Sequence, residues 1–346
     1  MEAGGAQKVA FLLHRGFQEL GDSSQLWFLY TKRAFYKEDA GVQSLLPHSP
    51  SLFDYVRISV RLFRKLRESR PDVLITHTHY ANVLGQLIAL LAGVPVRIAV
   101  HHNPLPTYPR LARIADCFLG QCGVYSKIVA VSDAVVATLQ SYPRSYARRL
   151  TRIHNGISTI SPSSQDIRSI LGIPASQPLL VNVGRISRQK NQATLLRALL
   201  ELQGAHLLII GDGELSQDLH AQATSLGVAN RVHFTGEIPA EDVAACLKSA
   251  DLFVFPSLWE SMGLAVLEAM HSGLPVVASD IPALRELLGD AALFVSPTDA
   301  SALAAAVKRV ISDLDLADTL RSQSRRRAAA FSLENMVGSY RKLIAD

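Results

Sequence analysis

The chain has 346 residues, of which 48% are hydrophobic and 19% are charged. This composition excludes a disordered chain, and the length favours two domains over one. The net charge is +5, but residues 1–160 hold 19 Lys and Arg against 10 Asp and Glu, whereas residues 161–346 hold 16 against 20. The basic first half predicts an anionic partner, such as phospholipid headgroups or a lipid diphosphate. No basic run with interleaved aromatic residues indicates nucleic acid.

The cysteines and the apolar stretches predict a protein of the cytoplasm. Three scattered cysteines are too few for a disulfide framework or a zinc site, so reduced thiols are expected. The first residues lack the pattern of a signal peptide. The most apolar stretch, residues 83–100, is interrupted by a glutamine, a proline and an arginine, which argues against a membrane span. We therefore expect a soluble protein, or one bound peripherally to the inner face of the cell membrane.

Short apolar runs alternate with helical patterns along the first half of the chain, which predicts a parallel α/β domain. The expected strands are residues 26–30, 73–77, 96–101, 127–131 and 151–154. The expected helices are residues 5–20, 52–69, 82–92, 111–120 and 134–140. His101 and His102 follow directly on one of these strands, so we expect them at its carboxyl end.

The helix predicted at residues 52–69 carries five basic side chains. Arg57, Arg61, Arg64 and Lys65 have the spacing of one helix face, and apolar residues, including Val56, Val60 and Phe63, lie between the basic ones. One interpretation is a helix that lies on an anionic membrane surface. The alternative is an ordinary solvated face above an apolar stripe that packs into the core.

The second half repeats the alternation of strands and helices after a linker-like segment, residues 158–164. A strand at residues 179–183 leads into a loop with Gly184, Arg185 and Lys190. An arginine and a lysine near a glycine turn supply cations for a diphosphate. The next strand, residues 206–210, ends at two more glycines, Gly211 and Gly213, which allow a ligand to approach the backbone closely.

Two carboxylates flank the start of a later helix. Glu260 follows the apolar strand at residues 251–255, and Glu268 lies eight residues further on, inside the helix that begins near Gly263 and Leu264. Free backbone N–H groups at this helix start can hold a phosphate, while the carboxylates accept hydroxyl protons. In a parallel sheet all three loops open on the same edge, where ligands bind. The sequence thus predicts two Rossmann-like domains with a cleft between them.

These motifs resemble the retaining glycosyltransferases of family 4, whose fold is GT-B, with two Rossmann-like domains whose parallel sheets face each other across a cleft. The resemblance extends over nearly the whole chain. It rests on Gly184-Arg185, Lys190-Asn191, Gly211-Asp212-Gly213 and residues 129–133, 153–157, 256–270 and 275–280. It implies an acceptor-binding domain at residues 1–160, a nucleotide-sugar domain at residues 161–330, and a final helix, residues 331–346, that packs toward the first domain.

The resemblance also implies roles for the candidate residues. Glu268 would bind the ribose, Glu260 the transferred sugar, and the N–H groups near Gly263 and Leu264 a phosphate. Gly5 would let its loop approach the diphosphate from the first domain. His101 would contact the reacting sugar, although His102 is the alternative. The family often has Glu-Gly-Phe-Gly where this chain has Ser261 and Met262 after Glu260, which would alter the sugar pocket.

The implied reaction is transfer of a sugar, with retention, from a nucleotide-diphosphate sugar to a glycan or lipid-linked acceptor, in the biosynthesis of cell-surface polysaccharide or glycolipid. The leaving phosphate helps to deprotonate the acceptor, and neither a metal nor another cofactor is expected. Two alternatives are a non-catalytic GT-B binding protein and another GT-B enzyme, such as a nucleotide-sugar epimerase. Donor sugar, base, acceptor and linkage are left open.

One departure concerns the first domain. The strand that usually precedes the glycine loop of the family is missing before Gly4 and Gly5. We expect a first sheet without its central strand, with unpaired edges. A start codon assigned too late or a shortened chain would explain this, and a rearranged sheet is the alternative.

Overall fold

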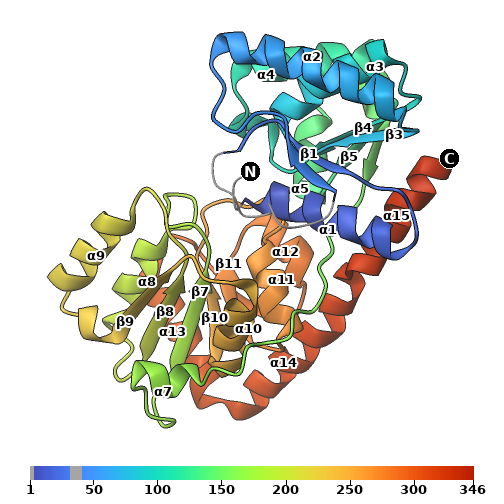
Figure 1. The fold of residues 1–346 in the computed structure, drawn as a ribbon. Helices are drawn as coiled ribbons and strands as arrows, with labels where there is room; N and C mark the ends of the chain where they lie inside the picture. Colours follow the sequence, from blue (N-terminus) through green and yellow to red (C-terminus); the bar gives the residue numbers. More distant parts are fainter. Residues whose placement is uncertain (1–3, 32–40) are drawn as a thin grey trace. The chain divides into compact units, whose positions relative to one another are not determined.

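The computed structural model describes residues 4–31 and 41–346. The chain forms two compact units, unit 1 with Met1–Ile157 and Ser332–Asp346, and unit 2 with Ser158–Phe331 (Figure 1). Each unit combines parallel strands with helices, so the predicted α/β class is confirmed. The sequence placed the domain boundaries at residues 160 and 330.

Unit 1 contains two separate parallel sheets among its described residues. Its strands are β1 (Leu26–Phe28), β2 (Val42–Ser44), β3 (Val73–Thr76), β4 (Val96–His101), β5 (Lys127–Ala130) and β6 (Leu150–Arg152). Strands β1 and β2 pair only with each other, and the other four form a sheet in the order β3-β4-β5-β6. In the described part of the chain, one edge of β1 and one edge of β3 therefore have no strand partner.

The helices of unit 1 include three that form one layer. The helices are α1 (Gly5–Glu19), α2 (Leu52–Ser69), α3 (Gln86–Ala92), α4 (Arg110–Gln121), α5 (Asp133–Leu139), α6 (Arg144–Ala147) and α15 (Leu333–Ala345), with a π-helical turn η1 (Ala81–Gly85) and a 3₁₀ turn η2 (Leu105–Thr107). Helix α2 begins at a capping box: the Ser51 side chain accepts from the backbone N–H of Asp54, and the Asp54 carboxylate accepts from the backbone N–H of Ser51. It packs against α3 and η1, and α4 packs against η1 as well.

The last helix, α15, belongs to unit 1 and packs against α1. The contact is close, because a Cβ atom at Gly16 would lie 2.5 Å from a methyl group of Val337. Before the chain enters unit 2, Ile157 forms a parallel bridge with Ser332. A Cβ atom at Gly156 would lie 2.0 Å from the backbone oxygen of Ser332, so only glycine fits where these two segments pass.

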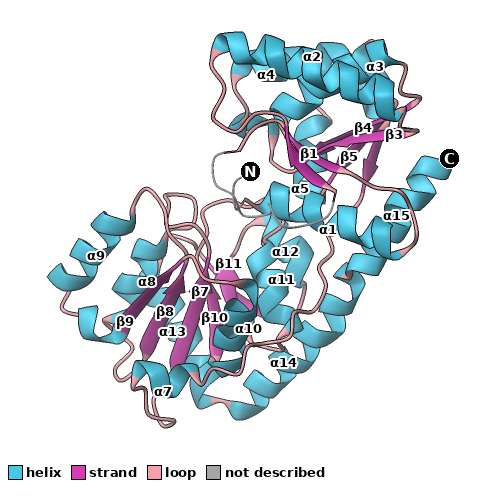
Figure 2. Ribbon diagram, viewed as in Figure 1, coloured by secondary structure: helices cyan, strands magenta, loops and turns pink. Residues whose placement is uncertain are grey.

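Unit 2 has a single six-stranded parallel sheet (Figure 2). Its strands are β7 (Leu179–Val183), β8 (His206–Ile210), β9 (Val232–Gly236), β10 (Leu252–Phe255), β11 (Val276–Ser279) and β12 (Ala292–Val295). Its helices are α7 (Ile167–Leu171), α8 (Gln192–Leu199), α9 (Ser216–Ser225), α10 (Ala240–Ser249), α11 (Leu264–His271), α12 (Pro282–Leu288), α13 (Ala300–Ser312) and α14 (Leu314–Ala328), with 3₁₀ turns η3 (Ala229–Arg231) and η4 (Ala329–Phe331). The strand order is β12-β11-β10-β7-β8-β9.

The central strands of unit 2 are continuous apolar runs because helices cover both faces of the sheet. All four residues of β10 and all four of β11 are buried. Helix α8 packs against α13, and α11 packs against α14. The main core joins residues of α8, β8, β10 and α13, including Leu196, Ile209, Val254 and Val307. This core holds the strand ends, and therefore the loops that follow them, in fixed positions.

The close passage at Gly156 gives a test of the packing in unit 1. Gly156→Ala should lower the free energy of unfolding by about 1–3 kcal/mol, since the added methyl group meets backbone that cannot move aside cheaply. Gly338→Ala is the matched control: this exposed glycine in α15 has open space around its Cβ position. It should raise the free energy of unfolding by about 0.5–1 kcal/mol, because alanine favours a helix interior. Urea denaturation measures both values, and equal stability of the two variants would contradict the described passage.

Candidate functional site

The predicted site lies at the carboxyl-end edge of the unit 2 sheet. The chain runs from β7 outward through β8 to β9, then crosses back to β10 on the other side of β7 and continues to β12. Strands β7 and β10 are thus neighbours whose following loops lead to opposite sides of the sheet. Open α/β sheets bind ligands at such a switch point, outside the carboxyl ends of the strands. The loops after β7 and β10 carry most of the residues predicted from the sequence.

The glycines of this edge are required by contacts between loops. Gly184 and Gly211 have φ angles of 153° and 127°, which favour glycine. A Cβ atom at Gly211 would lie 2.3 Å from the backbone oxygen of Gly184, and one at Gly213 would lie 2.2 Å from that of Ile186. Two backbone bonds fix the same contact, from Gly184 N–H to Ile210 O at 2.9 Å and from Ile186 N–H to Asp212 O at 3.0 Å. Hence Gly211 and Gly213 hold the loops after β7 and β8 together.

Lys190 and Glu260 form an ion pair between the loops after β7 and β10. The Lys190 Nζ atom lies 2.6 Å from Glu260 Oε1, and the two side chains are only 17% and 6% exposed. The ammonium group also lies 4.7 Å from the ring centroid of Phe255, a cation–π distance. The structure thus brings together a cation and a carboxylate that the sequence placed in two different subsites. Sequence reasoning could not see this contact, because the residues are 70 positions apart.

Asn191 is a site residue to which the sequence assigned no role. It adopts the left-handed conformation, with φ of 55°, directly before α8. Its side-chain amide donates to Pro256 O at 3.0 Å and to Pro297 O at 2.7 Å. These bonds join the loops after β7, β10 and β12. The sequence signal for this role was an asparagine directly after Lys190 and before a predicted helix. Asparagine is one of the non-glycine residues that most often adopt positive φ.

Helix α11 presents free amide groups beside the ion pair. It begins after Gly263, whose φ is 91°, and has no side-chain cap. The N–H groups of Val266 and Leu267 donate to Gly263 O at 3.0 Å and 3.2 Å, so only those of Leu264 and Ala265 have no intrahelical partner. They lie at the positive end of the helix dipole. Ser261 is partly exposed, whereas the Met262 side chain is 3% exposed and faces the interior. Glu268, one turn into the helix, is partly buried.

Arg185 is an exposed cation of the same loop as Lys190. Its side chain is exposed, and it makes no ion pair with the described part of the chain. Its backbone oxygen accepts a hydrogen bond from Gln192 Nε2 at 3.1 Å, which fixes the turn that carries it. Arg185 and Lys190 thus come from one loop, the first open to solvent and the second paired. Among the described residues, no group of three His, Cys, Asp or Glu side chains could hold a metal ion.

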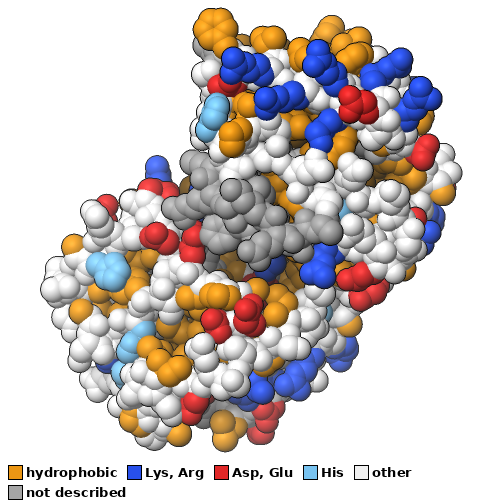
Figure 3. Space-filling view, in the orientation of Figure 1, with side chains coloured by type: hydrophobic (Ala, Val, Ile, Leu, Met, Phe, Trp, Pro, Cys, Tyr) orange, Lys and Arg blue, Asp and Glu red, His pale blue; other side chains and the backbone are white. Residues whose placement is uncertain are grey.

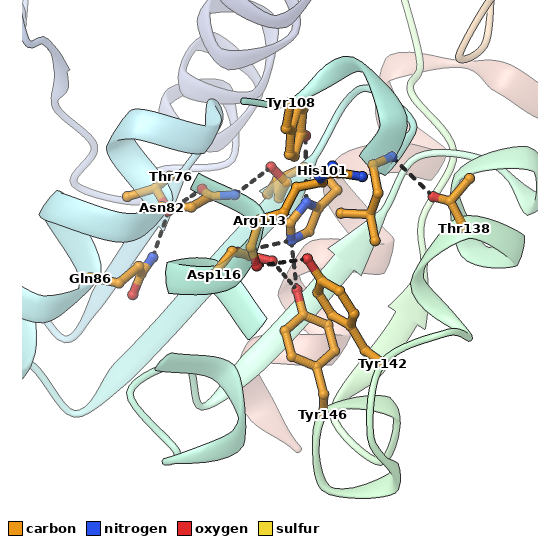
Figure 4. A network of polar contacts seen from close by, with 12 residues as sticks. Thr76, Asn82, Gln86, His101, Tyr108, Arg113, Asp116, Thr138, Tyr142 and Tyr146 are labelled. Atoms are coloured by element: carbon orange, nitrogen blue, oxygen red, sulfur yellow. Dashed lines mark hydrogen bonds and ion pairs between the residues drawn. The ribbon is translucent and has the colours of Figure 1, made fainter. Parts of the chain in front are cut away.

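In unit 1, the ring of His101 is enclosed at the end of β4. The side chain has no exposed surface, and its Nε2 and Nδ1 atoms lie 2.9 Å and 3.4 Å from the hydroxyl groups of Tyr146 and Tyr108 (Figure 4). Tyr146 donates to the buried carboxylate of Asp116 at 3.0 Å, and Asp116 itself lies 3.6 Å from His101 Nε2. Burial lowers the pKa of His101, although Asp116 opposes this shift.

His102 lies apart from that network, next to His77 at the end of β3. Its Nε2 atom is 2.9 Å from His77 Nδ1, and the two rings stack with centroids 5.2 Å apart. Burial lowers the pKa of His102 well below its usual value, and burial lowers the pKa of His77 to about 4. Both imidazoles are therefore neutral near pH 7. Of the two candidate histidines, His102 is the one whose ring is not enclosed by tyrosines. Gly5, the remaining candidate of unit 1, is the exposed first residue of α1.

The switch point of this α/β domain thus carries a paired lysine, an exposed arginine, carboxylates and a helix start without a side-chain cap. Comparison with known proteins identifies the class. Residues 163–327 match the family model described as glycosyl transferases group 1, and residues 3–160 match that of glycosyltransferase family 4. The chain belongs to this family of glycosyltransferases.

Individual relatives agree with the family models. The chain is 28% identical over 302 residues to the lipopolysaccharide core biosynthesis glycosyltransferase LpsE of Rhizobium meliloti, a match that covers 85% of this chain and 81% of that protein. It is also 28% identical over 249 residues to an Escherichia coli UDP-Gal:alpha-D-GlcNAc-diphosphoundecaprenol alpha-1,3-galactosyltransferase, covering 67% and 63% of the two chains. HepE of Anabaena, solved with UDP and glucose, aligns with a TM-score of 0.87 at 22% identity over 100% of this chain and 97% of that one. The fold is GT-B, as predicted.

The lowered pKa values of His77 and His102 predict a pH dependence of stability. Because their pKa values are lowered in the folded chain, the unfolded chain binds protons that the folded chain does not once the pH falls below about 6.5. Their contribution to the free energy of unfolding is complete above that pH and is lost as the pH falls toward the pKa of His77, about 4. As the pH falls from about 6.5 toward 4, the free energy of unfolding should decrease less steeply in His77→Gln than in the wild type, by up to about 1.4 kcal/mol per pH unit.

Urea denaturation of the wild type and of His77→Gln at a series of pH values measures this dependence. His220→Gln, at an exposed position of unit 2, controls for the loss of one histidine. Identical pH profiles for the wild type and His77→Gln would show that the pKa of His77 is not lowered by folding.

Proposed function

We propose that the protein is a retaining glycosyltransferase that moves a sugar from a nucleotide-diphosphate sugar to a glycan or lipid-linked acceptor. Its pathway would be the biosynthesis of cell-surface polysaccharide or glycolipid, as the names of the bacterial relatives suggest. The observation that carries the proposal is the ion pair of Lys190 with Glu260 at the switch point, directly before the uncapped start of α11. The cations and amides found there suit a diphosphate, and the carboxylates suit the hydroxyl groups of a ribose and a sugar.

In this proposal Arg185 and Lys190 bind the diphosphate. Arg185 is exposed and can meet the ligand first, whereas Lys190 must exchange Glu260 for a phosphate oxygen. The exchange keeps the ammonium charge compensated, because one charge-assisted bond is replaced by another of the same kind. It also leaves the Glu260 carboxylate free to accept from sugar hydroxyls. Phosphate binding and sugar binding are thereby coupled through one side chain.

The reaction breaks the bond between the anomeric carbon and the phosphate oxygen, and the acceptor oxygen bonds to the same face of the sugar. The leaving phosphate takes the acceptor proton. Negative charge builds on the diphosphate, where Arg185, Lys190 and the amides at Leu264 stabilise it. Positive charge builds on the sugar ring, near Glu260. Glu268 binds the ribose, and the backbone and side chains of Ser261 and Met262 shape the site.

The structure changes how we assign the histidines of unit 1. His101 was predicted to be catalytic together with Glu260, but its ring is enclosed by Tyr108, Tyr146 and Asp116. That enclosure favours His102 for contact with the sugar and gives His101 the task of fixing the end of β4. Gly5, at the start of α1, would let the backbone approach the diphosphate, since this helix also lacks a side-chain cap.

We further propose that the reaction needs no metal or other cofactor, because two cations and a helix start offset the diphosphate charge. The expected partners are the nucleotide sugar and its acceptor, and not nucleic acid. The expected location is the cytoplasm, with peripheral binding to the inner face of the cell membrane. No helix among the described residues has the length and apolarity to cross a membrane.

The proposed function is tested by nucleotide release. Purified protein is incubated with a panel of nucleotide sugars in the presence of a chelator, with and without glycan and lipid-linked acceptors. Release of nucleoside diphosphate that depends on an acceptor, with the sugar recovered on that acceptor, supports a transferase. Release without any acceptor would indicate an epimerase, and binding of nucleotide without release would indicate a non-catalytic protein.

Removal of Glu260 and removal of Glu268 should change different kinetic parameters. Glu268→Ala should mainly raise the Michaelis constant for the donor, because ribose contacts change little during the reaction. Glu260→Ala should lower turnover by about 10²-fold or more, the usual effect of removing an electrostatic group near developing charge. Steady-state kinetics with any accepted donor measures both. If the Michaelis constant and the turnover number changed alike in the two variants, or if Glu260→Ala kept full turnover, Glu260 and Glu268 would not have the separate roles proposed here.

A further inference from the structure

Three helices of unit 1 expose large apolar side chains on their outer side. Helix α2 packs against α3 and η1, and α4 also packs against η1, so the helices form one layer. The exposed apolar residues of this layer are Phe53, Val56, Val60 and Phe63 on α2, Leu87, Leu90 and Leu91 on α3, and Leu111, Ile114 and Phe118 on α4. Phe53 is 86% exposed, Leu111 81% and Phe118 63%. We call these ten residues the apolar surface.

The α2 helix shows that this exposure is patterned. Its residues Ile58, Leu62 and Leu66 are buried in a core shared with α3 and with the two leucines that follow β2. Phe53, Val56, Val60 and Phe63 follow at intervals of three and four on another face, the spacing of a second apolar stripe. The sequence allowed Val56, Val60 and Phe63 to belong to the core, but they face outward.

Basic side chains share this outer face. Arg57, Arg64 and Arg67 are exposed and lie three or four positions from the apolar residues of the stripe. Arg61 and Lys65 lie closer to the two-stranded sheet: Arg61 donates to Leu45 O at 2.6 Å, and the Lys65 ammonium group lies 5.1 Å from the centroid of the Trp27 ring. The basic face predicted from the sequence is therefore split, and only part of it borders the apolar surface.

The layer has almost no exposed negative charge. Of the three acidic residues on α2 and α4, Asp54 and Asp116 are buried, and only Glu68 is exposed; α3 has none. Arg110 adds an exposed cation at the start of α4. Figure 3 shows basic and hydrophobic side chains together over the part of unit 1 where Figure 1 labels α2. A large exposed apolar area bordered by one sign of charge marks an interaction site.

We propose that the apolar surface and its arginines dock unit 1 onto an anionic lipid bilayer. A bilayer interface accepts both features at once, because apolar side chains enter the boundary between headgroups and acyl chains while arginines contact anionic headgroups. A second copy of the chain fits less well, since a symmetric contact would bring Arg57, Arg64 and Arg67 of both copies together. The inference rests on the proposed function in one respect: it assigns a surface to the peripheral membrane binding proposed above. It does not require the transferase activity.

Vesicle sedimentation of the full chain tests the proposal. The protein should bind vesicles of phosphatidylcholine mixed with phosphatidylglycerol, bind less as salt is added, and bind vesicles of phosphatidylcholine alone weakly. The triple variant Arg57→Ala, Arg64→Ala, Arg67→Ala should lose on the order of 100-fold in affinity for the anionic vesicles. The double variant Phe53→Ser, Phe118→Ser should lose about tenfold or more, because it removes the aromatic side chains that enter the interface.

A matched control removes the same charge elsewhere. Lys308→Ala, Arg309→Ala, Arg326→Ala changes three exposed cations on α13 and α14 of unit 2 and should leave vesicle binding unchanged. The proposal is overturned if the wild type does not bind anionic vesicles, or if the control loses as much affinity as the α2 triple variant. It is also overturned if light scattering finds a dimer that Phe53→Ser, Phe118→Ser converts to a monomer, because the surface would then join two copies.

Discussion

The ion pair between Lys190 and Glu260 is the contact on which the site of unit 2 depends. It joins the loops after β7 and β10 across the switch point of the sheet, and both side chains are largely buried. Removing one partner of a buried pair leaves the other charge without compensation, which is far more unfavourable than keeping or replacing both. The pair is therefore stable while the site is empty, yet either charge can be compensated by a ligand. In the proposed reaction, a diphosphate supplies the negative charge that Lys190 needs, and Glu260 then turns to the sugar.

The glycines impose the second constraint. Gly211 and Gly213 lie against the backbone of Gly184 and Ile186 at distances that admit no Cβ atom. These contacts hold the loops after β7 and β8 as one body, and Asn191 ties that body to the loop after β10. The positions of the cations and of the α11 amides thus follow from backbone packing. A site held in this way needs little rearrangement when charge develops in the reaction.

Much of the fold could be predicted because parallel strands are short apolar runs between turn residues. The strands at residues 179–183 and 206–210 agree with β7 and β8 to the residue. Strand β2 was missed, since its three residues include a glutamine and a serine. The enclosure of His101 was also missed, because Tyr108, Asp116 and Tyr146 approach it from distant positions. Periodicity identified two faces of α2 but could not decide which apolar residues face outward.

The central claim is that the switch point between the loops after β7 and β10 binds a nucleoside diphosphate by taking Lys190 from Glu260. A crystal structure of the chain with UDP or GDP tests it most directly. The account predicts the diphosphate beside α11, with Lys190 Nζ bonded to a phosphate oxygen and displaced from Glu260 Oε1. Nucleotide bound elsewhere, or bound at the switch point with Lys190 still paired to Glu260, would contradict it.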